Sequence, residues 1–599
     1  MENKKQAIIL SGVAIVALLA LIIGATYAYF RASGNSGSNT DINVTTYTLD
    51  LLSFEMGSDI KINADQTSFA SGKGNATGST FAKAILTANN KTNTATKNYY
   101  MYLNISNNTF TYTQNETTPE LLLTITDVSG NAITSITGLT YKTVIDGKGT
   151  SVSGFDITTK SGLLTLFDNR EITASPTKTE EWNVTVTFVN YNVNQTGNAG
   201  KSFNAKLMIQ QEEYELTLAD ICAGKTLSDC VISQYTGTQG DNALYYHNST
   251  LTNGAGDNSY RYAGGDYVLT EAGKATGATM MIGYDNTVTT ALIDFYCNGT
   301  KQYVGYASSC STSHYYLIKG DTTQYQTYNE ALNASVEKGY LTKDNVKNFV
   351  CFGSDATTCP TENLYRIIGV FNNHVKLIKY DYAKSSLLGT DGDYSKEYSN
   401  YFSGEQGESP SSNSLYYWNK STGKNTWSES NLNKINLNTN FVNNIGTIWA
   451  KKIATTTWKV GGGTYANLRD AVPKTAYQYE VGSSASTTTY DAKIGLMYVS
   501  DYYYSASPSA WTLVGYNSDY TKSYASAKGE NWLYGGGWDW TISRISDFSD
   551  SAFIVSYFGC VYYDYVYDCY YGVRPSFSLL SSTTYVSGSG SMSDPVRIN

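Results

Sequence analysis

A tyrosine-dense stretch near the end of the chain carries the residues best suited to bind a ligand. Seven of the fifteen residues at 557–571 are tyrosine, and no lysine, arginine, glutamate or glutamine interrupts them. Tyrosine and tryptophan offer large, stiff contact areas with a polar end, which is why recognition surfaces use them. Since tyrosine is common along the whole chain, some of these rings must belong to the core. We predict a recognition face of eight aromatic residues and two carboxylates: Trp538, Trp540, Tyr562, Tyr563, Asp564, Tyr565, Tyr567, Asp568, Tyr570 and Tyr571.

The eight cysteines fall into four close pairs along the sequence. An even number of cysteines is typical of a disulfide framework in exported proteins, and local pairing is the simplest prediction. A zinc site is disfavoured, because the spacings are wider than Cys-x-x-Cys and no histidine lies beside them. We predict four disulfides: Cys222–Cys230, Cys297–Cys310, Cys351–Cys359 and Cys560–Cys569.

Residues that catalysis or metal binding would need are sparse. The histidines His247, His314 and His374 show no metal-ligand spacing, and a serine near His314 in a serine-rich segment is not a catalytic triad. Asp564 and Asp568 could ligate a hard cation through oxygen, but the EPN and QPD strings of calcium-dependent sugar-binding lectins are absent. A glycosidase needs two carboxylates at a set separation, which sequence does not give. We predict no catalytic residue, no metal and no cofactor.

The composition indicates a β-rich globular chain with a polar but weakly charged surface. Charged residues make up 16% and hydrophobic residues 41% of the 599 positions, and 53 residues are tyrosine. Such a composition favours strands and turns over long helices. The net charge is −9, and no Lys/Arg cluster follows the first few residues. Binding to a phosphate backbone needs concentrated positive charge, so we predict no nucleic-acid partner.

The first thirty residues have the pattern of an export signal. Lys4 and Lys5 precede an almost wholly apolar run at residues 7–25. A small-x-small site allows cleavage after Ala28, whereas nineteen apolar residues could also span a bilayer as a retained anchor. We therefore predict a signal peptide or signal anchor at residues 1–30, with the rest of the chain outside the cytoplasm, secreted or anchored in the membrane through residues 7–25.

Residues 31–212 show repeated short runs of alternating apolar and polar residues. Examples are NYYMYLNISN, ELLLTITDVSG, EWNVTVTFVNYN and KSFNAKLMIQQEE, each bounded by Gly, Asn or Asp. This spacing predicts an antiparallel β-sandwich. TYAYF directly after the apolar run, followed by TTYTLDLL, resembles the exported camelysin and TasA-type family of biofilm-fibre proteins. The resemblance implies a jelly-roll-like sandwich and matrix-fibre relatives; no HExxH motif supports the protease activity that has been claimed for the family.

From residue 213 the pattern changes. Residues 213–258 are expected to form a connector, with a short helix pinned by the first cysteine pair and a glycine-rich loop. Downstream, YRIIGV and VKLIKY flank FNNH, a strong hairpin signal. Residues 267–346 are expected to be an insertion that ends in an amphipathic helix. A second helix is predicted from Ser428 or Ser430 through NLNKINLNTNFVNNIG.

Four motifs of this region carry a second resemblance. YRIIGV, W-x-x-S-x-L-x-x-x-x-LN from Trp427, WTISR and GVRPSFSL occur in this order. They resemble a domain of unknown function that is widespread in secreted proteins of gut Firmicutes, over about residues 259–599. Their order and the closing G-[VF]-R strand are also similar to the C-type lectin-like fold of formylglycine-generating enzymes. We expect Arg574, in the closing strand, to make a structural hydrogen bond or ion pair.

Together these patterns predict a mainly β protein, with an N-terminal antiparallel, jelly-roll-like β-sandwich followed by an α+β C-type lectin-like domain with an insertion. We expect an exported bacterial cell-surface protein that acts as a non-enzymatic adhesin. Its partner would be a host or bacterial surface glycan or protein. The alternative is a biofilm matrix or fibre subunit, in which residues 31–50 are exchanged between copies to give a homopolymer. A second alternative is an extracellular glycan-active enzyme.

Overall fold

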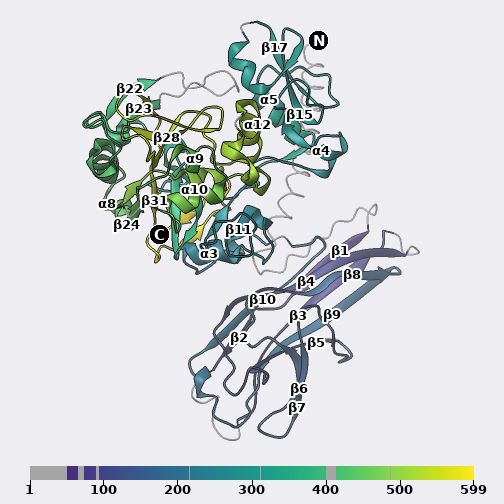
Figure 1. Cartoon of the computed structure of the whole chain (residues 1–599). Coiled ribbons are helices and arrows are strands. Elements are labelled where there is room, and N and C mark those ends of the chain that lie inside the picture. The colour runs from purple at the N-terminus through teal and green to yellow at the C-terminus, as the bar shows by residue number, and fades with distance from the viewer. Residues whose placement is uncertain are drawn as a thin grey trace, which may run out of the picture. The chain divides into compact units, whose positions relative to one another are not determined.

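The computed structural model describes residues 50–64, 73–89, 94–214, 216–310, 312–398, 413–485, 488–517 and 519–599 (Figure 1). The chain divides into two compact units, Met1–Leu216 and Thr217–Asn599. Strands dominate both units, as the composition predicts. The predicted signal or anchor at residues 1–30 lies outside the described residues. Among the helices that are described, none is long and apolar enough to cross a membrane.

The first unit is a β-sandwich. A six-stranded sheet has the order β1-β3-β9-β5-β7-β6, and a four-stranded sheet has the order β2-β10-β4-β8. The strand bounds are β1 (Leu51–Met56), β2 (Ile60–Asn63), β3 (Ala76–Thr87), β4 (Ala95–Asn108), β5 (Leu121–Asp127), β6 (Tyr141–Ile145), β7 (Ser151–Asp156), β8 (Gly162–Ala174), β9 (Thr177–Phe188) and β10 (Ser202–Gln210).

The alternation read from the sequence forms the core of this sandwich. In β10 buried and half-buried residues alternate without a break along SFNAKLMIQ. β3 and β9 pair antiparallel over their whole length, from Ala76 opposite Phe188 to Thr87 opposite Thr177. Because every second residue of a strand points to the same face, both sheets contribute inward side chains to one shared core. The predicted antiparallel sandwich is confirmed.

A seven-stranded sheet forms the centre of the second unit. β19 pairs with β20, beside the main order β11-β12-β20-β21-β31-β26. The predicted hairpin is present, because Phe371 pairs with His374 and both central residues, Asn372 and Asn373, have positive φ. The strands of this sheet are β11 (Leu244–Tyr246), β12 (Tyr260–Tyr262), β19 (Phe349–Cys351), β20 (Leu364–Phe371), β21 (His374–Lys379), β26 (Ile494–Gly495) and β31 (Ser576–Ser578).

The segment expected to be an insertion has a small core of its own, which also includes Tyr524. Its strands β14 and β15 pair in parallel, whereas β16 and β17 pair antiparallel with β15. Its elements are β13 (Val268–Leu269), α4 (Glu271–Ala275), β14 (Met280–Ile282), β15 (Ala291–Cys297), β16 (Thr300–Gln302), β17 (His314–Ile318), α5 (Tyr328–Glu337) and β18 (Leu341–Thr342).

The segment expected to be a connector belongs to the second unit from Thr217 on. α2 (Leu218–Cys222) and α3 (Leu227–Ser233) begin at capping threonines, and Leu227 and Val231 are buried in the main core. The helix predicted near residue 430 is a π-helix, Leu432–Phe441, continued by α7 (Val442–Asn444). Besides short 3-10 helices, the other strands and α-helices of this unit are β22 (Tyr394–Tyr398), β23 (Asn413–Tyr417), β24 (Thr456–Lys459), β25 (Thr489–Ala492), β27 (Asp539–Arg544), β28 (Ser551–Val555), β29 (Val561–Tyr565), β30 (Tyr570–Tyr571), β32 (Tyr585–Ser587), β33 (Arg597–Ile598), α6 (Ser385–Leu388), α8 (Thr447–Ala450), α9 (Tyr465–Leu468), α10 (Pro473–Glu480), α11 (Val499–Tyr504) and α12 (Tyr520–Glu530).

Three of the four predicted disulfides are formed: Cys222–Cys230, Cys297–Cys310 and Cys351–Cys359. They indicate an extracellular or secreted protein. The fourth prediction is wrong, because Cys560 and Cys569 are free thiols. Strand β29 runs between them, and five extended residues span roughly 16 Å. A disulfide needs Cα atoms within about 7 Å, so the two thiols at opposite ends of this strand stay apart.

Alkylation of the unreduced, denatured protein tests this pairing. We expect two modified cysteines per chain, Cys560 and Cys569, because the other six are held in disulfides. Peptide mapping by mass spectrometry identifies the modified sites. A cross-linked peptide that joins Cys560 to Cys569 would contradict the arrangement, and reduction before alkylation provides the control with eight modified sites.

Candidate functional site

The predicted recognition residues gather around β29, an outer strand of the sheet β27-β28-β29. In the part of the chain that the structure describes, four tyrosines are exposed, and three of them lie within six residues: Tyr562 (42% exposed), Tyr565 (49%) and Tyr567 (38%). The fourth is Tyr520. Exposed aromatic rings are therefore concentrated at this edge and are not spread over the surface.

Neighbouring rings from two other segments extend this edge. The Tyr563 ring stacks beside Tyr562 at 5.5 Å, beside Phe548 at 5.7 Å, and meets Tyr465 of α9 edge-on at 5.3 Å. Phe548 is itself 46% exposed. The Arg469 guanidinium, at the end of α9, lies 4.5 Å from the centres of the Tyr465 and Tyr562 rings. We call the six aromatic side chains the tyrosine cluster: Tyr465, Phe548, Tyr562, Tyr563, Tyr565 and Tyr567.

Trp540 is a correction to the predicted face. It is 1% exposed, and its indole Nε1 donates to the Tyr416 carbonyl at 2.8 Å. The physical reason is that β27 is covered on both faces, so none of its side chains from Asp539 to Ser543 reaches the surface. Trp538, just before this strand, is half-buried and stacks on Tyr571 at 5.3 Å.

Tyr571, Asp564 and Tyr570 stabilise the edge from inside. The Tyr571 hydroxyl donates to Asp564 Oδ2 at 2.5 Å, and burial raises the pKa of Tyr571 far above its usual value. Tyr570 pairs with Tyr417 of β23, and the Lys396 amine lies 4.8 Å from its ring. Asp568 is exposed. Within the described residues, no three His, Cys, Asp or Glu side chains are grouped as a metal site would require.

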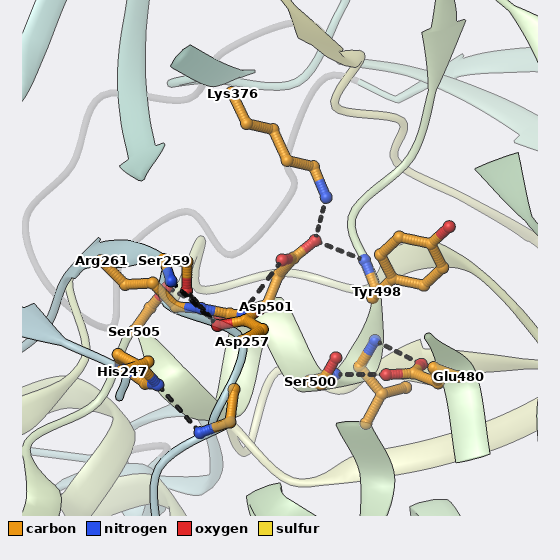
Figure 2. A network of polar contacts seen from close by, with 12 residues as sticks. His247, Asp257, Ser259, Arg261, Lys376, Glu480, Tyr498, Ser500, Asp501 and Ser505 are labelled. Carbon is orange, nitrogen blue, oxygen red and sulfur yellow. Dashed lines mark hydrogen bonds and ion pairs between the residues drawn. The ribbon is translucent and has the colours of Figure 1, made fainter. Parts of the chain in front are cut away.

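A second feature, absent from the sequence-based prediction, is a buried network of charges (Figure 2). Arg261 Nη2 contacts Asp257 Oδ2 at 2.7 Å, and Lys376 Nζ contacts Asp501 Oδ2 at 2.5 Å. Asp501 also accepts from the Tyr498 amide at 2.9 Å. Burial alone raises the pKa of Asp257, but the Arg261 guanidinium and hydrogen bonds from Ser259 outweigh it and lower that pKa to about 2. The charges of these two pairs balance.

Aromatic rings surround the two cations of this network. The Lys376 amine lies 4.7 Å from the Tyr498 ring and 5.4 Å from Trp458, while Arg261 lies 4.7 Å from Phe371 and 5.0 Å from Tyr504. All of these residues except Tyr504 border a cavity of about 460 Å³. Since each cation already has a carboxylate partner and stacked rings, the network has a structural explanation without a ligand.

Glu480, beside this network, joins the end of α10 to the start of α11. Its two carboxyl oxygens accept from the amides of Val499 at 2.9 Å and Ser500 at 2.8 Å, and the Ser543 hydroxyl also donates to it. Burial raises the pKa of Glu480 to about 7, although the hydrogen bonds from Ser500 and Ser543 act in the opposite direction. The carboxyl therefore changes charge near neutral pH while serving as a structural link.

His247 is fully buried on the other side of the network. Its Nδ1 accepts from the Ala255 amide at 3.0 Å, and its ring packs against Tyr504 at 4.7 Å and Trp511 at 5.3 Å. Burial and the nearby Arg261 hold the pKa of His247 well below its usual range. A neutral, packed imidazole fits a core role and not a metal or catalytic one.

Comparison of the chain with protein-family models and with curated proteins finds no match. The resemblances to fibre proteins and to lectin-like domains therefore stay predictions. The geometry favours the tyrosine cluster as the candidate binding site, because its rings reach solvent, whereas the charges of the network are satisfied internally.

The Glu480 carboxyl gives the protein a testable dependence on pH. Its folded pKa of about 7 lies above the usual value of 4.5, so the unfolded state releases this proton first as the pH rises. Stability contributed by Glu480 is present below about pH 4.5 and is lost as the pH rises to 7, by roughly 3 kcal/mol. We expect Glu480→Gln to remove this loss, measured as the free energy of urea unfolding at pH 5, 6, 7 and 8.

The quantity to compare is the slope of the unfolding free energy against pH, because the glutamine amide also changes the hydrogen bonds at the start of α11. His247 acts with the opposite sign: its lowered pKa makes stability increase as the pH rises toward 6.5, in the wild type and in the variant alike. Glu271→Gln, at an exposed glutamate, is the matched control and should keep the wild-type slope. An unchanged slope in Glu480→Gln would show that Glu480 titrates normally.

Proposed function

We propose that the protein is an exported bacterial surface adhesin that binds a glycan through the tyrosine cluster. The observation that carries this proposal is the concentration of Tyr562, Tyr565 and Tyr567, three of the four exposed tyrosines among the described residues, at one sheet edge. Burying such rings in a ligand interface recovers apolar area that is exposed in the free protein. The disulfides fit an extracellular setting.

A glycan suits this edge better than a flat protein surface. Sugar rings stack on aromatic faces through their C–H groups, while their hydroxyls need polar partners at the rim. The tyrosine hydroxyls, the exposed Asp568 and the Arg469 guanidinium supply such partners around the rings.

Removing the exposed rings tests the proposal. We expect the triple variant Tyr562→Ala, Tyr565→Ala and Tyr567→Ala to lose at least tenfold in affinity for glycans that the full-length protein binds on an array. Each stacking ring lost costs about 1 kcal/mol, and each 1.4 kcal/mol is a factor of ten. The measurement is titration of array hits by calorimetry with both proteins.

Tyr520→Ala is the matched control, since Tyr520 is 50% exposed but lies in α12, where its ring packs on Phe558 and contacts no member of the tyrosine cluster. It should bind as the wild type does. Equal binding by the triple variant would exclude the tyrosine cluster as the site. If the protein binds other proteins but no glycan, the proposed ligand class would be wrong, while the tyrosine cluster would remain the candidate binding surface.

A second candidate function, a fibre subunit, is favoured by the outer strands of the first unit. In the described part of the chain β1 and β6 form the two edges of the six-stranded sheet. β1 exposes Leu51 (54%) and Met56 (37%), and β6 exposes Ile145 (59%). Exposed apolar edge strands are templates for pairing with another chain. The residues expected to be exchanged, 31–50, lie outside the described part except for Asp50.

Deletion of residues 31–50 distinguishes this candidate. If copies exchange this segment, gel filtration of the full-length protein should show polymers, and the deletion should convert them to monomers. Glycan binding through the tyrosine cluster should be unaffected, because that cluster belongs to the other unit. A monomeric full-length protein would argue against the fibre function.

A further inference from the structure

A second cavity, of about 550 Å³, lies within the second unit. Its walls come from α5 and β14 of the insertion, from the ends of β20 and β21, and from the loop after α12. The volume is within the range of small-molecule sites. None of the residues predicted from the sequence to bind ligand lines this cavity.

All but one of the buried cations in this unit contact a carboxylate. Five lysine and arginine side chains of the described chain are buried: Arg261, Arg366, Lys376, Lys379 and Arg574. Four of them contact a carboxylate at 2.5–2.7 Å: Arg261 with Asp257, Arg366 with Asp266, Lys376 with Asp501 and Arg574 with Asp539. The exception is Lys379, which has no carboxylate within ion-pair distance among the described residues.

Lys379 is 3% exposed and lines the second cavity. Its amine makes no hydrogen bond to another described residue; the ring of Tyr365 lies 5.8 Å away. Burial lowers the pKa of Lys379 to about 8, so the amine is still mostly protonated at neutral pH. The charges of Asp381 and Glu362 act in the opposite direction to burial on this pKa, but neither carboxylate forms an ion pair with Lys379. A buried cation without a direct ion pair is costly, and a ligand anion in the cavity would supply that pair.

Arg574 adds a second cationic donor to the same cavity. Its Nη2 contacts Asp539 and the Leu533 carbonyl, as expected for a structural ion pair in the closing strand. Its Nε is buried and has no hydrogen-bond acceptor in the described structure. Gly535 leaves room beside this side chain, because a Cβ at that position would lie 3.4 Å from Arg574 Cζ and 3.0 Å from the Tyr382 hydroxyl.

The rest of the lining suits a ligand with hydroxyl groups. Asn329 and Asn333, one turn apart on α5, both line the cavity, and neither amide hydrogen-bonds to another described residue. Aromatic side chains, among them Trp532 and Tyr328, form other parts of the wall. The wall also carries two carboxylates, Asp266 in its ion pair with Arg366 and Asp381. Amides, rings and the Lys379 amine are the partners that a sugar bearing a carboxylate requires.

We propose that this cavity binds an acidic sugar, with the ligand carboxylate paired to Lys379 and the hydroxyls held by Asn329 and Asn333. This site is separate from the tyrosine cluster and does not depend on the function proposed for that cluster. The ligand carboxylate takes the place that Asp257, Asp266, Asp501 and Asp539 hold beside the other four buried cations.

Calorimetry of the full-length protein with glucuronate, galacturonate and N-acetylneuraminate tests the site. We expect saturable binding of at least one acid, no binding of methyl glucoside, and a loss of at least tenfold in Lys379→Met. Lys384→Met is the matched control: it removes the same charge from an exposed position five residues away, and should bind within twofold of the wild type. Asn333→Leu, at an exposed position of α5, should weaken acid binding without removing the charge.

Thermal unfolding without ligand gives a second readout. Lys379→Met should raise the melting temperature, because the cost of the unpaired buried charge is removed, and added glucuronate should stabilise the wild type but not this variant. Wild-type affinity in Lys379→Met, or no binding of any of the three acids, would overturn the proposal. Inorganic phosphate that binds as tightly as the sugar acids would overturn the assignment to sugars.

Discussion

The free-energy cost of burying charged side chains determines which segments of the second unit pack together. Arg366 and Lys376 lie inside its central sheet, and each needs a carboxylate from a distant part of the chain: Asp266 is 100 residues from Arg366, and Asp501 is 125 residues from Lys376. Removing one partner of a buried pair costs about 3–5 kcal/mol, because the other charge is left unpaired. Each pair thus fixes two segments, the start of the insertion against β20 and α11 against β21.

Aromatic rings complete the environment of these cations, and some of them are tyrosines: Tyr498 beside Lys376, and Tyr477 and Tyr504 beside Arg261. Arg366 lies 4.2 Å from the Phe349 ring and 4.7 Å from Trp532, and the rings around Lys376 and Arg261 act in the same way. Tyrosine serves here because its ring faces a cation while its hydroxyl finds a carbonyl. The Tyr504 ring lies 5.0 Å from Arg261, and the Tyr504 hydroxyl donates to the Asn253 carbonyl at 3.1 Å. Packing around buried cations does not explain the exposed rings of the tyrosine cluster, which require a separate explanation.

Local patterns predicted the parts of the fold that depend on neighbouring residues. Alternation of apolar and polar residues predicted the sandwich, and the FNNH motif predicted the hairpin. The short spacing between cysteines predicted three of the disulfides. Cys560 and Cys569 have a spacing similar to that of those pairs, but the five-residue strand β29 lies between them and keeps them apart. The partners of Arg366 and Lys376 were beyond prediction, because nothing near either residue specifies a carboxylate that is 100 or 125 positions away. The lysines within the apolar run VKLIKY and the arginine within YRIIGV were the local signals of buried charge.

The position of the tyrosine cluster on an outer strand is itself an argument about function. Outer strands are prone to pair with other chains, and proteins usually protect them with charge, proline or short length. β29 has five residues and one carboxylate, Asp564, which is occupied by the Tyr571 hydroxyl, so charge gives it little protection. The Tyr562 ring packs in part on Tyr563 and Arg469, but Tyr565 is 49% exposed, and lysine there would protect the edge. Packing therefore accounts for only part of these rings, and a ligand-binding role would explain why exposed aromatic rings stand at this edge despite the risk of aggregation.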